Sequence, residues 1–367
     1  MKSWKRLMAM MLTGILCAGC VVGCGSSESA AEPVAGSASA SGSKQPIITV
    51  MTNSMGGETQ HMLQAGAILQ GQELGYTINI LAPNNSGNKQ KVINNLAAAQ
   101  TYSDAIVFMS NHNSVEPNID YLKDIVPALS DARSAGIPIV MMYYDVNDDT
   151  RCDTFVGTNN YRLGRELGNT IAQNQPGAVV GLLQADTGSK THKIREQGIT
   201  ESLRKRGCTV LEDEAVANWN WDTAVTVATS LLENHPEMTT IVCTSDSLAQ
   251  AVAQAVQVAA RTEVSEESGE TLPDSEYETV VAEPVQIYAV GPCAGGLSAV
   301  ANGTIKAEVA EQPVQIGRDS IVLADQLIRG QTVKKVNRTP YVLVTQDNAQ
   351  SMLDRINADL LAAGIGG

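Results

Sequence analysis

Aromatic residues and positive charges are scarce in this sequence of 367 residues. Only two phenylalanines occur, and Phe, Trp and Tyr together make up 4% of the chain. Lys and Arg number 25 against 39 Asp and Glu, which gives a formal net charge of −14. A protein of that charge is repelled by nucleic acid phosphates and by anionic membrane surfaces, so we expect neither as its main partner.

Motifs for catalysis, cofactors and metals are also missing. The sequence has no Gly-x-Ser-x-Gly elbow, no phosphate-binding loop and no Cys/His pair in a recognisable context, so no enzymatic activity is expected. Asp145, Asn147 and Asp149 have the spacing of a calcium loop, but Thr150 stands where that loop needs glycine. We therefore expect no metal and no cofactor.

Cysteine is used sparingly beyond the N-terminal region. Four cysteines lie after residue 24: Cys152, Cys208, Cys243 and Cys293. Their spacing matches no metal site, and a disulfide framework is unusual in a domain of this size. We expect them to be small buried hydrophobic residues, and the sequence leaves open whether any of them pair.

The N-terminus has the layout of a secretory signal. Lys2, Lys5 and Arg6 precede an apolar stretch over 7–22, shorter than the ~20 residues that a membrane-spanning helix needs. Small residues precede Cys20 and Cys24, as in the bacterial lipoprotein box. We expect removal of residues 1–23 and diacylglyceryl modification of Cys24, with Cys20 as the alternative.

Residues 25–45 are mostly Gly, Ser and Ala, which predicts a flexible tether with a reach of ~25 Å. Together, 24–45 would hold the folded part on the outer face of the cell membrane. Two acyl chains suffice for stable anchoring. No other apolar stretch approaches the length of a membrane-spanning helix, so the lipid is the only membrane contact expected.

Apolar, β-rich runs alternate with helical stretches along the rest of the chain. Strands are expected at 47–52, 77–81, 104–109, 138–143, 178–183, 209–214, 239–244, 285–290 and 306–311. Helices are expected at 59–74, 89–100, 125–135, 161–173, 193–206, 223–234, 248–258 and 296–302. Such alternation predicts an α/β fold of two doubly wound lobes, whose parallel sheets are covered by helices on both faces.

Polar residues follow many of the expected strands. They include Asn53, Ser110, Tyr144, Asp145, Gln184, Asp186, Ser245, Asp246 and Cys293. Ligands of open parallel sheets bind beyond the carboxyl ends of the strands, so these side chains are expected to surround a neutral polar solute.

Several short segments occur in an order that resembles the type I periplasmic sugar-binding proteins. The segments are 135–140 (AGIPIV), 155–164 (FVGTNNYRLG), 195–198 (REQG), 221–222 (WD), 245–249 (SDSLA) and 302–307 (NGTIKA). Members of this family are the ribose- and galactose-type solute-binding subunits of ABC transporters, and they are related to the effector domains of lac-type repressors. The resemblance extends over 46–350.

This resemblance implies two lobes, joined by a three-strand hinge, that close over one small solute. The N-terminal lobe would comprise 46–157 and about 312–345, and the C-terminal lobe 158–311 and about 346–367. The acidic segment 261–283 would be a solvated insertion, or alternatively a docking surface for another protein.

The resemblance also implies where the solute binds. The expected ligand-binding residues are Asn53, Gln60, Ser110, Tyr143, Tyr144, Asp145, Arg195, Trp219, Trp221, Ser245, Cys293 and Glu311. Arg195 would donate to ring and hydroxyl oxygens, although pairing with Glu196 or Asp186 is an alternative. Trp221, assisted by Trp219, would stack on the sugar, although both could instead cover the core of the lobe. Asp246 is expected to cap the helix that follows it, and Asn160 to be a cap or hinge residue.

This sequence departs from the family pattern at three places. Glu58, Thr59 and Gln60 replace an aromatic pair, Cys293 replaces an aspartate, and the usual glutamine appears as Glu311 or Gln312, depending on register. Tyr143 and Tyr144 would supply the missing stacking surface.

We therefore expect a monomeric, lipid-anchored solute-binding protein that delivers a sugar or sugar-like polyol to an ABC permease. Two alternatives stay open: presentation of the solute to a membrane sensor kinase, and transport of a non-sugar ligand such as an autoinducer, a nucleoside or an amino-acid derivative.

Overall fold

The computed structural model describes residues 45–83, 88–110, 119–144, 152–186, 189–212, 215–268 and 285–366. Residues Gln45–Gly367 form one compact unit. The expected signal and lipidation sites, Asp145, and the calcium-like pattern lie outside the described residues. Within the described ranges, no helix is both long and apolar enough to cross a membrane.

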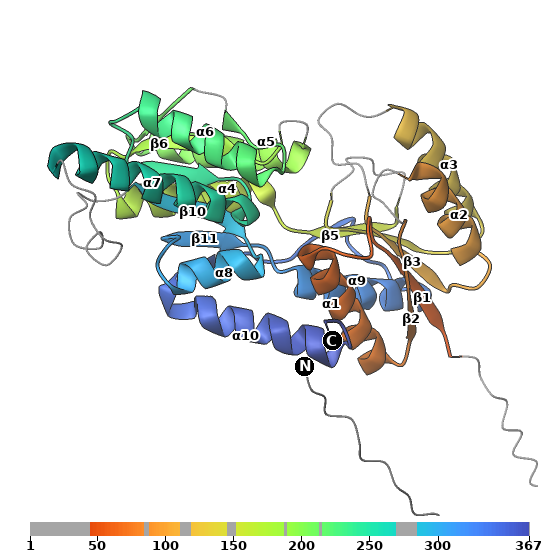
Figure 1. Ribbon diagram of the computed structural model, residues 1–367. Helices are drawn as coiled ribbons and strands as arrows, with labels where there is room; N and C mark the ends of the chain where they lie inside the picture. Colours follow the sequence, from red (N-terminus) through yellow and green to blue (C-terminus); the bar gives the residue numbers. More distant parts are fainter. Residues whose placement is uncertain are drawn as a thin grey trace, which may run out of the picture. The chain divides into compact units, whose positions relative to one another are not determined.

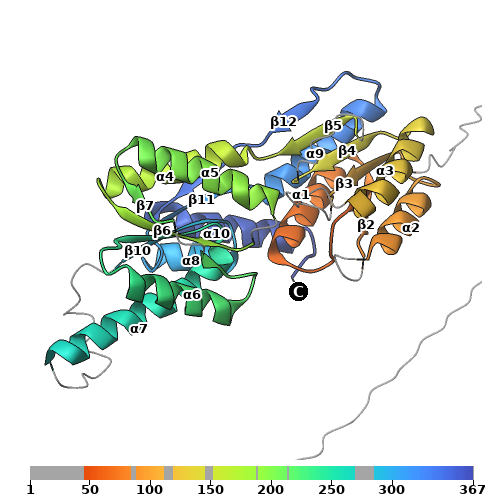
Figure 2. The ribbon, with the colours of Figure 1, turned by 90° about the horizontal axis from the view of Figure 1, so that it is seen from above.

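The first sheet has six parallel strands in the order β12-β5-β4-β3-β1-β2 (Figures 1 and 2). The strands are β1 (Ile47–Met51), β2 (Thr77–Leu81), β3 (Ala105–Phe108), β4 (Ile139–Met142), β5 (Thr154–Gly157) and β12 (Val336–Arg338). The helices are α1 (Glu58–Leu74), α2 (Lys89–Ala99), α3 (Ile119–Ser134) and α9 (Pro313–Ile328). In β1, Ile48 and Val50 pack beneath α1 and α9, whereas Met51 packs beneath α2 and α3. The strands are apolar on both faces because helices cover both.

The second sheet has the order β13-β11-β10-β9-β6-β7, with β8 also pairing with β6. Its strands are β6 (Val179–Gln184), β7 (Thr209–Val210), β8 (Ala215–Val216), β9 (Thr240–Cys243), β10 (Gln286–Gly291), β11 (Ala307–Ala310) and β13 (Val342–Val344). One face packs against α4 (Asn160–Asn174) and α5 (Lys190–Lys205). The other packs against α6 (Trp221–Asn234), α7 (Ala249–Ser268), α8 (Ala294–Ala301) and α10 (Gln346–Ala362). Only β13 runs antiparallel to its neighbour among the described pairs of this sheet.

The chain passes between the two sheets at several points. It leaves the first sheet between β5 and α4, returns between β11 and α9, and passes again between β12 and β13. We call the two sheets with their helices the first and second lobes. The predicted α/β class with two parallel-dominant lobes is confirmed.

Some elements differ from the sequence expectation. Strands β5, β12 and β13 and helices α9 and α10 were not predicted, and the strand expected at 209–214 is instead two short strands, β7 and β8. Strands β7, β8, β12 and β13 have only two or three residues, which is too short to show a pattern. Helix α7 runs on to Ser268, so the acidic segment expected at 261–283 begins as helix, because glutamates do not interrupt one.

Two glycines allow α4 and α5 to pack closely. A Cβ atom on Gly164 would lie 2.1 Å from the backbone oxygen of Arg195, and one on Gly198 would lie 2.3 Å from that of Tyr161. Contacts this short have no room for a methyl group. The position of Arg195 therefore depends on glycine in the facing helix.

We expect Gly164→Ala to destabilise the protein by ~1–3 kcal/mol, because overpacking outweighs the ~0.5–1 kcal/mol that alanine normally gains within a helix. Thermal or urea unfolding measures this change. Gly56→Ala is the control, because nothing lies within 4 Å of a Cβ atom there. An unchanged or raised melting temperature for Gly164→Ala would contradict the close packing.

Candidate functional site

A cavity of about 590 Å3 is lined by residues from both lobes. The first turn of α1 and the residues after β4 contribute from the first lobe. Helix α5, the short 3-10 helix Asp246–Leu248 and the residues after β10 contribute from the second. Glu311, where the chain leaves β11 toward α9, completes the wall. The cavity thus lies at the carboxyl ends of several parallel strands, where ligands of such sheets bind.

Many of the sequence-predicted site residues lie in this cavity. They are Gln60, Tyr143, Tyr144, Arg195, Trp219, Ser245, Cys293 and Glu311. Of the two candidates Glu311 and Gln312, Glu311 lines the cavity, whereas the Gln312 side chain donates to the backbone oxygen of Pro340.

Three predicted residues do not line the cavity. Asn53 accepts a hydrogen bond from Gln60 at 2.8 Å and so supports a lining residue from behind. Ser110 is buried after β3, and Trp221 at the start of α6 donates to Gln254 at 3.4 Å. Asp145 lies outside the described residues.

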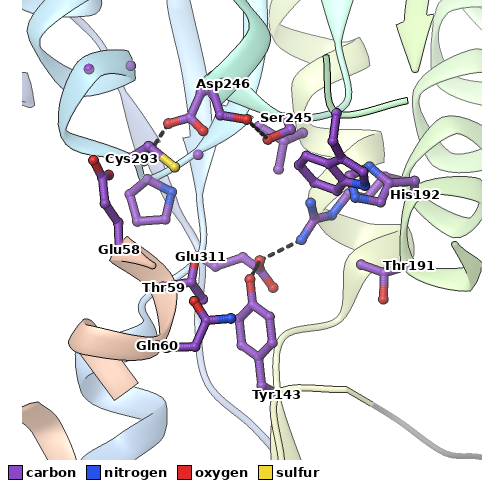
Figure 3. Close-up of a pocket in the computed structure, with 18 of the residues that line it drawn as sticks. Glu58, Thr59, Gln60, Tyr143, Thr191, His192, Ser245, Asp246, Cys293 and Glu311 are labelled. Atoms are coloured by element: carbon purple, nitrogen blue, oxygen red, sulfur yellow. Dashed lines mark hydrogen bonds and ion pairs between the residues drawn. The ribbon is translucent and has the colours of Figure 1, made fainter. Parts of the chain in front are cut away.

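The centre of the cavity wall is a buried ion pair between Arg195 and Glu311. Arg195 Nη2 lies 2.5 Å from Glu311 Oε2. The same oxygen accepts from the Tyr143 hydroxyl at 2.7 Å (Figure 3). Arg195 Nε donates to Asn160 at 2.8 Å, and Nη1 donates to the backbone oxygen of Thr244 at 3.3 Å. Asn160 thus orients the guanidinium, while the cap of α4 expected of it is made by Asn159.

Burial and neighbouring charges set the protonation of these groups. Burial lowers the pKa of Arg195, but Glu311 and the nearby tyrosines more than compensate and raise it. Burial, reinforced by Glu311, raises the pKa of Tyr143, and it raises that of Tyr144 to about 12. At neutral pH the cavity therefore holds one guanidinium and two neutral phenols, and phenols can donate hydrogen bonds.

Tyr143 has a backbone conformation that tyrosine rarely adopts. Its φ is 70°, in the left-handed region, and its ring packs edge-on against Tyr144 with centroids 4.8 Å apart. A non-glycine residue there costs ~1–3 kcal/mol, and such strain is concentrated at functional sites. In this backbone conformation the Tyr143 hydroxyl donates its hydrogen bond to Glu311.

His192 and Trp219 form the wall beside the ion pair. His192 is buried one turn before Arg195 on α5, with Nδ1 2.9 Å from the Thr244 hydroxyl. Burial, helped by the Arg195 charge, lowers its pKa to about 3, so the imidazole is neutral. Trp219 packs edge-on against it and is 55% exposed, which leaves indole surface free at the cavity. His192 precedes Arg195 by three residues on α5, a spacing that places both side chains on one face of the helix.

Carboxylates line the opposite side of the cavity. Asp246 is 2% exposed, lines the cavity and accepts from the backbone N–H of Cys293 at 2.5 Å, so it satisfies the start of α8. Burial raises its pKa to about 6, despite the hydrogen bond from Cys293. Glu58 joins this side from α1. Burial also raises the pKa of the Cys293 thiol, which is therefore protonated and unreactive at neutral pH.

Glu308 on β11 is a fully buried acid close to Asp246. Neither of its side-chain oxygens has a hydrogen-bond partner, and a Cβ atom on Gly291 would lie 2.4 Å from Oε1. Burial, with Asp246 nearby, raises its pKa well above the ordinary 4.5. Glu308 is therefore protonated in the native state at a pH where the unfolded chain ionises it.

We expect the free energy of unfolding to fall as pH rises above 4.5, because the unfolded chain then releases a proton that native Glu308 retains. Glu308→Gln removes this dependence, so in urea unfolding the variant gains stability relative to wild type as the pH rises above 4.5. Asp246 adds a slope of the same sign below about pH 6 in both proteins. Glu73→Gln, on the exposed face of α1, is the control, and parallel profiles for wild type and Glu308→Gln would contradict the assignment.

Among the described residues, no group of three or more His, Cys, Asp and Glu side chains is placed to hold a metal ion. Among the cysteines that the structure describes, none forms a disulfide; Cys152, Cys208 and Cys243 are buried and Cys293 is half-buried.

Residues 47–332 match the family described as the periplasmic binding protein domain. The chain is 23% identical to the D-apiose import binding protein of Actinobacillus succinogenes, over 78% of this chain and 84% of that protein. It is also 23% identical to the ribose import binding protein RbsB of Salmonella typhimurium, over 74% of this chain and 81% of that protein.

Solved structures of similar fold include a periplasmic solute-binding protein from Actinobacillus succinogenes with bound D-allose. The TM-score is 0.68 at 17% identity, covering 84% of this chain and 100% of that one. A sugar-binding protein from Bacillus halodurans gives a TM-score of 0.67 at 21% identity, and the match covers 84% of this chain and 99% of that one. At these identities the likeness establishes the fold.

Proposed function

Because the chain belongs to the periplasmic binding protein family of extracytoplasmic, non-enzymatic solute-binding proteins, we propose that it binds a sugar or sugar-like polyol in the cavity and delivers it to an ABC importer. The observation that carries this proposal is the cavity itself, where neutral hydrogen-bonding groups and one indole face surround an internally paired arginine. Two of the relatives are named as import binding proteins for D-apiose and for ribose, which favours the same ligand class.

The charges in the cavity favour an uncharged solute. Glu311 already neutralises Arg195, and Asp246 and Glu58 add carboxylates without a second lysine or arginine among the lining residues. A uronate or a sugar phosphate would meet net negative charge, whereas hydroxyl groups can donate to the carboxylates and accept from the phenols. A hydroxyl-rich neutral ring is therefore the best fit.

The mechanism we infer is a population shift. Walls from both lobes line one cavity, so a solute that bonds to both walls stabilises the closed arrangement over an open one. The ABC permease would recognise the closed form, and the protein would act as a monomer.

The ligand proposal is tested by a thermal-shift screen of neutral monosaccharides and polyols against uronates. A specific ligand raises the melting temperature by mass action, and we expect this from neutral compounds only. Trp219→Ala should weaken binding of the best compound about tenfold, because loss of aromatic contact costs ~0.5–1.5 kcal/mol beyond the buried area.

Trp221→Ala is the matched control, because Trp221 is exposed, lies two residues away and does not line the cavity. Equal effects of the two substitutions would remove Trp219 from the site. A screen in which only anionic compounds bind would overturn the proposed ligand class.

We further propose that the protein is anchored through a diacylated Cys24, with Cys20 as the alternative, on the outer face of the cell membrane. In a lipoprotein-processing host, Cys24→Ser should abolish incorporation of labelled fatty acid and release the protein from the membrane fraction. Cys20→Ser should leave both unchanged. The reverse pattern would assign Cys20, and an unlabelled wild-type protein would overturn the anchor.

A further inference from the structure

Glu58 makes a contact that joins the two lobes across the cavity. It is the first residue of α1 in the first lobe, and its Oε2 accepts a hydrogen bond from the backbone N–H of Ala294 at 2.7 Å. Ala294 is the first residue of α8 in the second lobe. Figure 3 shows Glu58 extending from the start of α1 toward Cys293, at the edge of the lining residues.

The start of α8 depends on side chains from elsewhere in the chain. Its N-cap residue, Cys293, makes no capping hydrogen bond with its own side chain. Asp246 takes the backbone N–H of Cys293 and Glu58 takes that of Ala294, so two carboxylates satisfy this helix end. A helix N-terminus carries partial positive charge, and hydrogen bonds to carboxylates are stronger than neutral ones.

These two carboxylates differ in their origin. Asp246 belongs to the same lobe as α8 and is buried, so its bond persists when the lobes separate. Glu58 is on the other lobe, so its bond exists only while the lobes are together. The N-terminus of α8 is therefore a fixed part of the second lobe, and Glu58 of the first lobe forms or loses its hydrogen bond there as the lobes meet or separate.

We propose that Glu58 is a latch, a positioning residue that holds the cavity closed by capping α8 across the opening. The proposal rests on the proposed function, because it assumes that solute enters and leaves between the lobes. The latch adds a protein–protein bond to those that the solute makes, and it must break for the solute to escape. Its loss should therefore accelerate release more than entry.

Hydrogen–deuterium exchange on the whole protein without solute tests the contact directly. In Glu58→Ala, peptides that cover the start of α8 should exchange faster, because the Ala294 amide loses its acceptor. Glu58→Gln keeps an acceptor without the charge and should be intermediate. Glu73→Ala is the matched control on the same helix, because Glu73 pairs with Arg318 within the first lobe.

A purely local role of Glu58 at the start of α1 would change exchange in α1 but not in α8, which would overturn the latch. A second readout is the carboxyl titration of Asp246 by NMR, because the Glu58 charge is one of the causes that raise its pKa. Glu58→Gln should lower that pKa, and an unchanged titration would contradict the proximity of the two carboxylates across the cavity.

Solute release provides the functional test. With the sugar identified by the screen, stopped-flow fluorescence should show a dissociation rate about three to ten times faster in Glu58→Ala, as expected for a charge-assisted hydrogen bond at an exposed position. An unchanged rate would overturn control of release by Glu58. If no sugar binds, the ligand proposal fails, and the exchange result alone still decides whether the latch contact exists.

Discussion

The buried ion pair between Arg195 and Glu311 is the interaction on which the arrangement of the site depends. It links a helix of the second lobe to the point where the chain returns to the first, and the Tyr143 hydroxyl adds a contact from the end of β4. Desolvating two charges is costly, and the pair is tolerable only because further hydrogen bonds satisfy the guanidinium. Removing one partner of such a pair typically costs ~3–5 kcal/mol, so both residues contribute to the stability of the fold as well as to the cavity wall.

The same pair sets the chemistry that is left for a solute. Arg195 already donates to a carboxylate, an amide oxygen and a backbone oxygen, so its charge is less available to bind an anionic solute. Its remaining N–H groups act as oriented donors in a wall that also contains two neutral phenols and a neutral imidazole. Fixed donors of this kind discriminate between patterns of hydroxyl groups, because a mismatched pattern leaves buried polar groups unpaired.

The repeated pattern in the sequence was sufficient to predict the class of fold, since buried parallel strands between helices leave a strong local signal. It also predicted Tyr144, Ser245 and Cys293 as cavity residues, because strand ends converge in such sheets. It could not reveal the Glu58 contact, which joins residues 236 positions apart, or the burial of Glu308.

The two tryptophans show the limit of reasoning from spacing. Asn218 and Trp219 both have positive φ, so the backbone turns there, and only the Trp219 indole lines the cavity. Ser110 and Asn53 follow central strands as expected but do not line the cavity. A strand end identifies the neighbourhood of a site, while the local backbone decides which side chain faces it.

The placement of these indoles also has a practical consequence. The whole chain holds three tryptophans, and one of them, Trp4, lies in the leader that is expected to be removed. The remaining two stand within two residues of each other, beside the cavity and largely open to water. The tryptophan emission of the processed protein would therefore come from Trp219 in the cavity wall and from Trp221 beside it, so an occupant that displaces water from the Trp219 indole would shift the emission wavelength without a label.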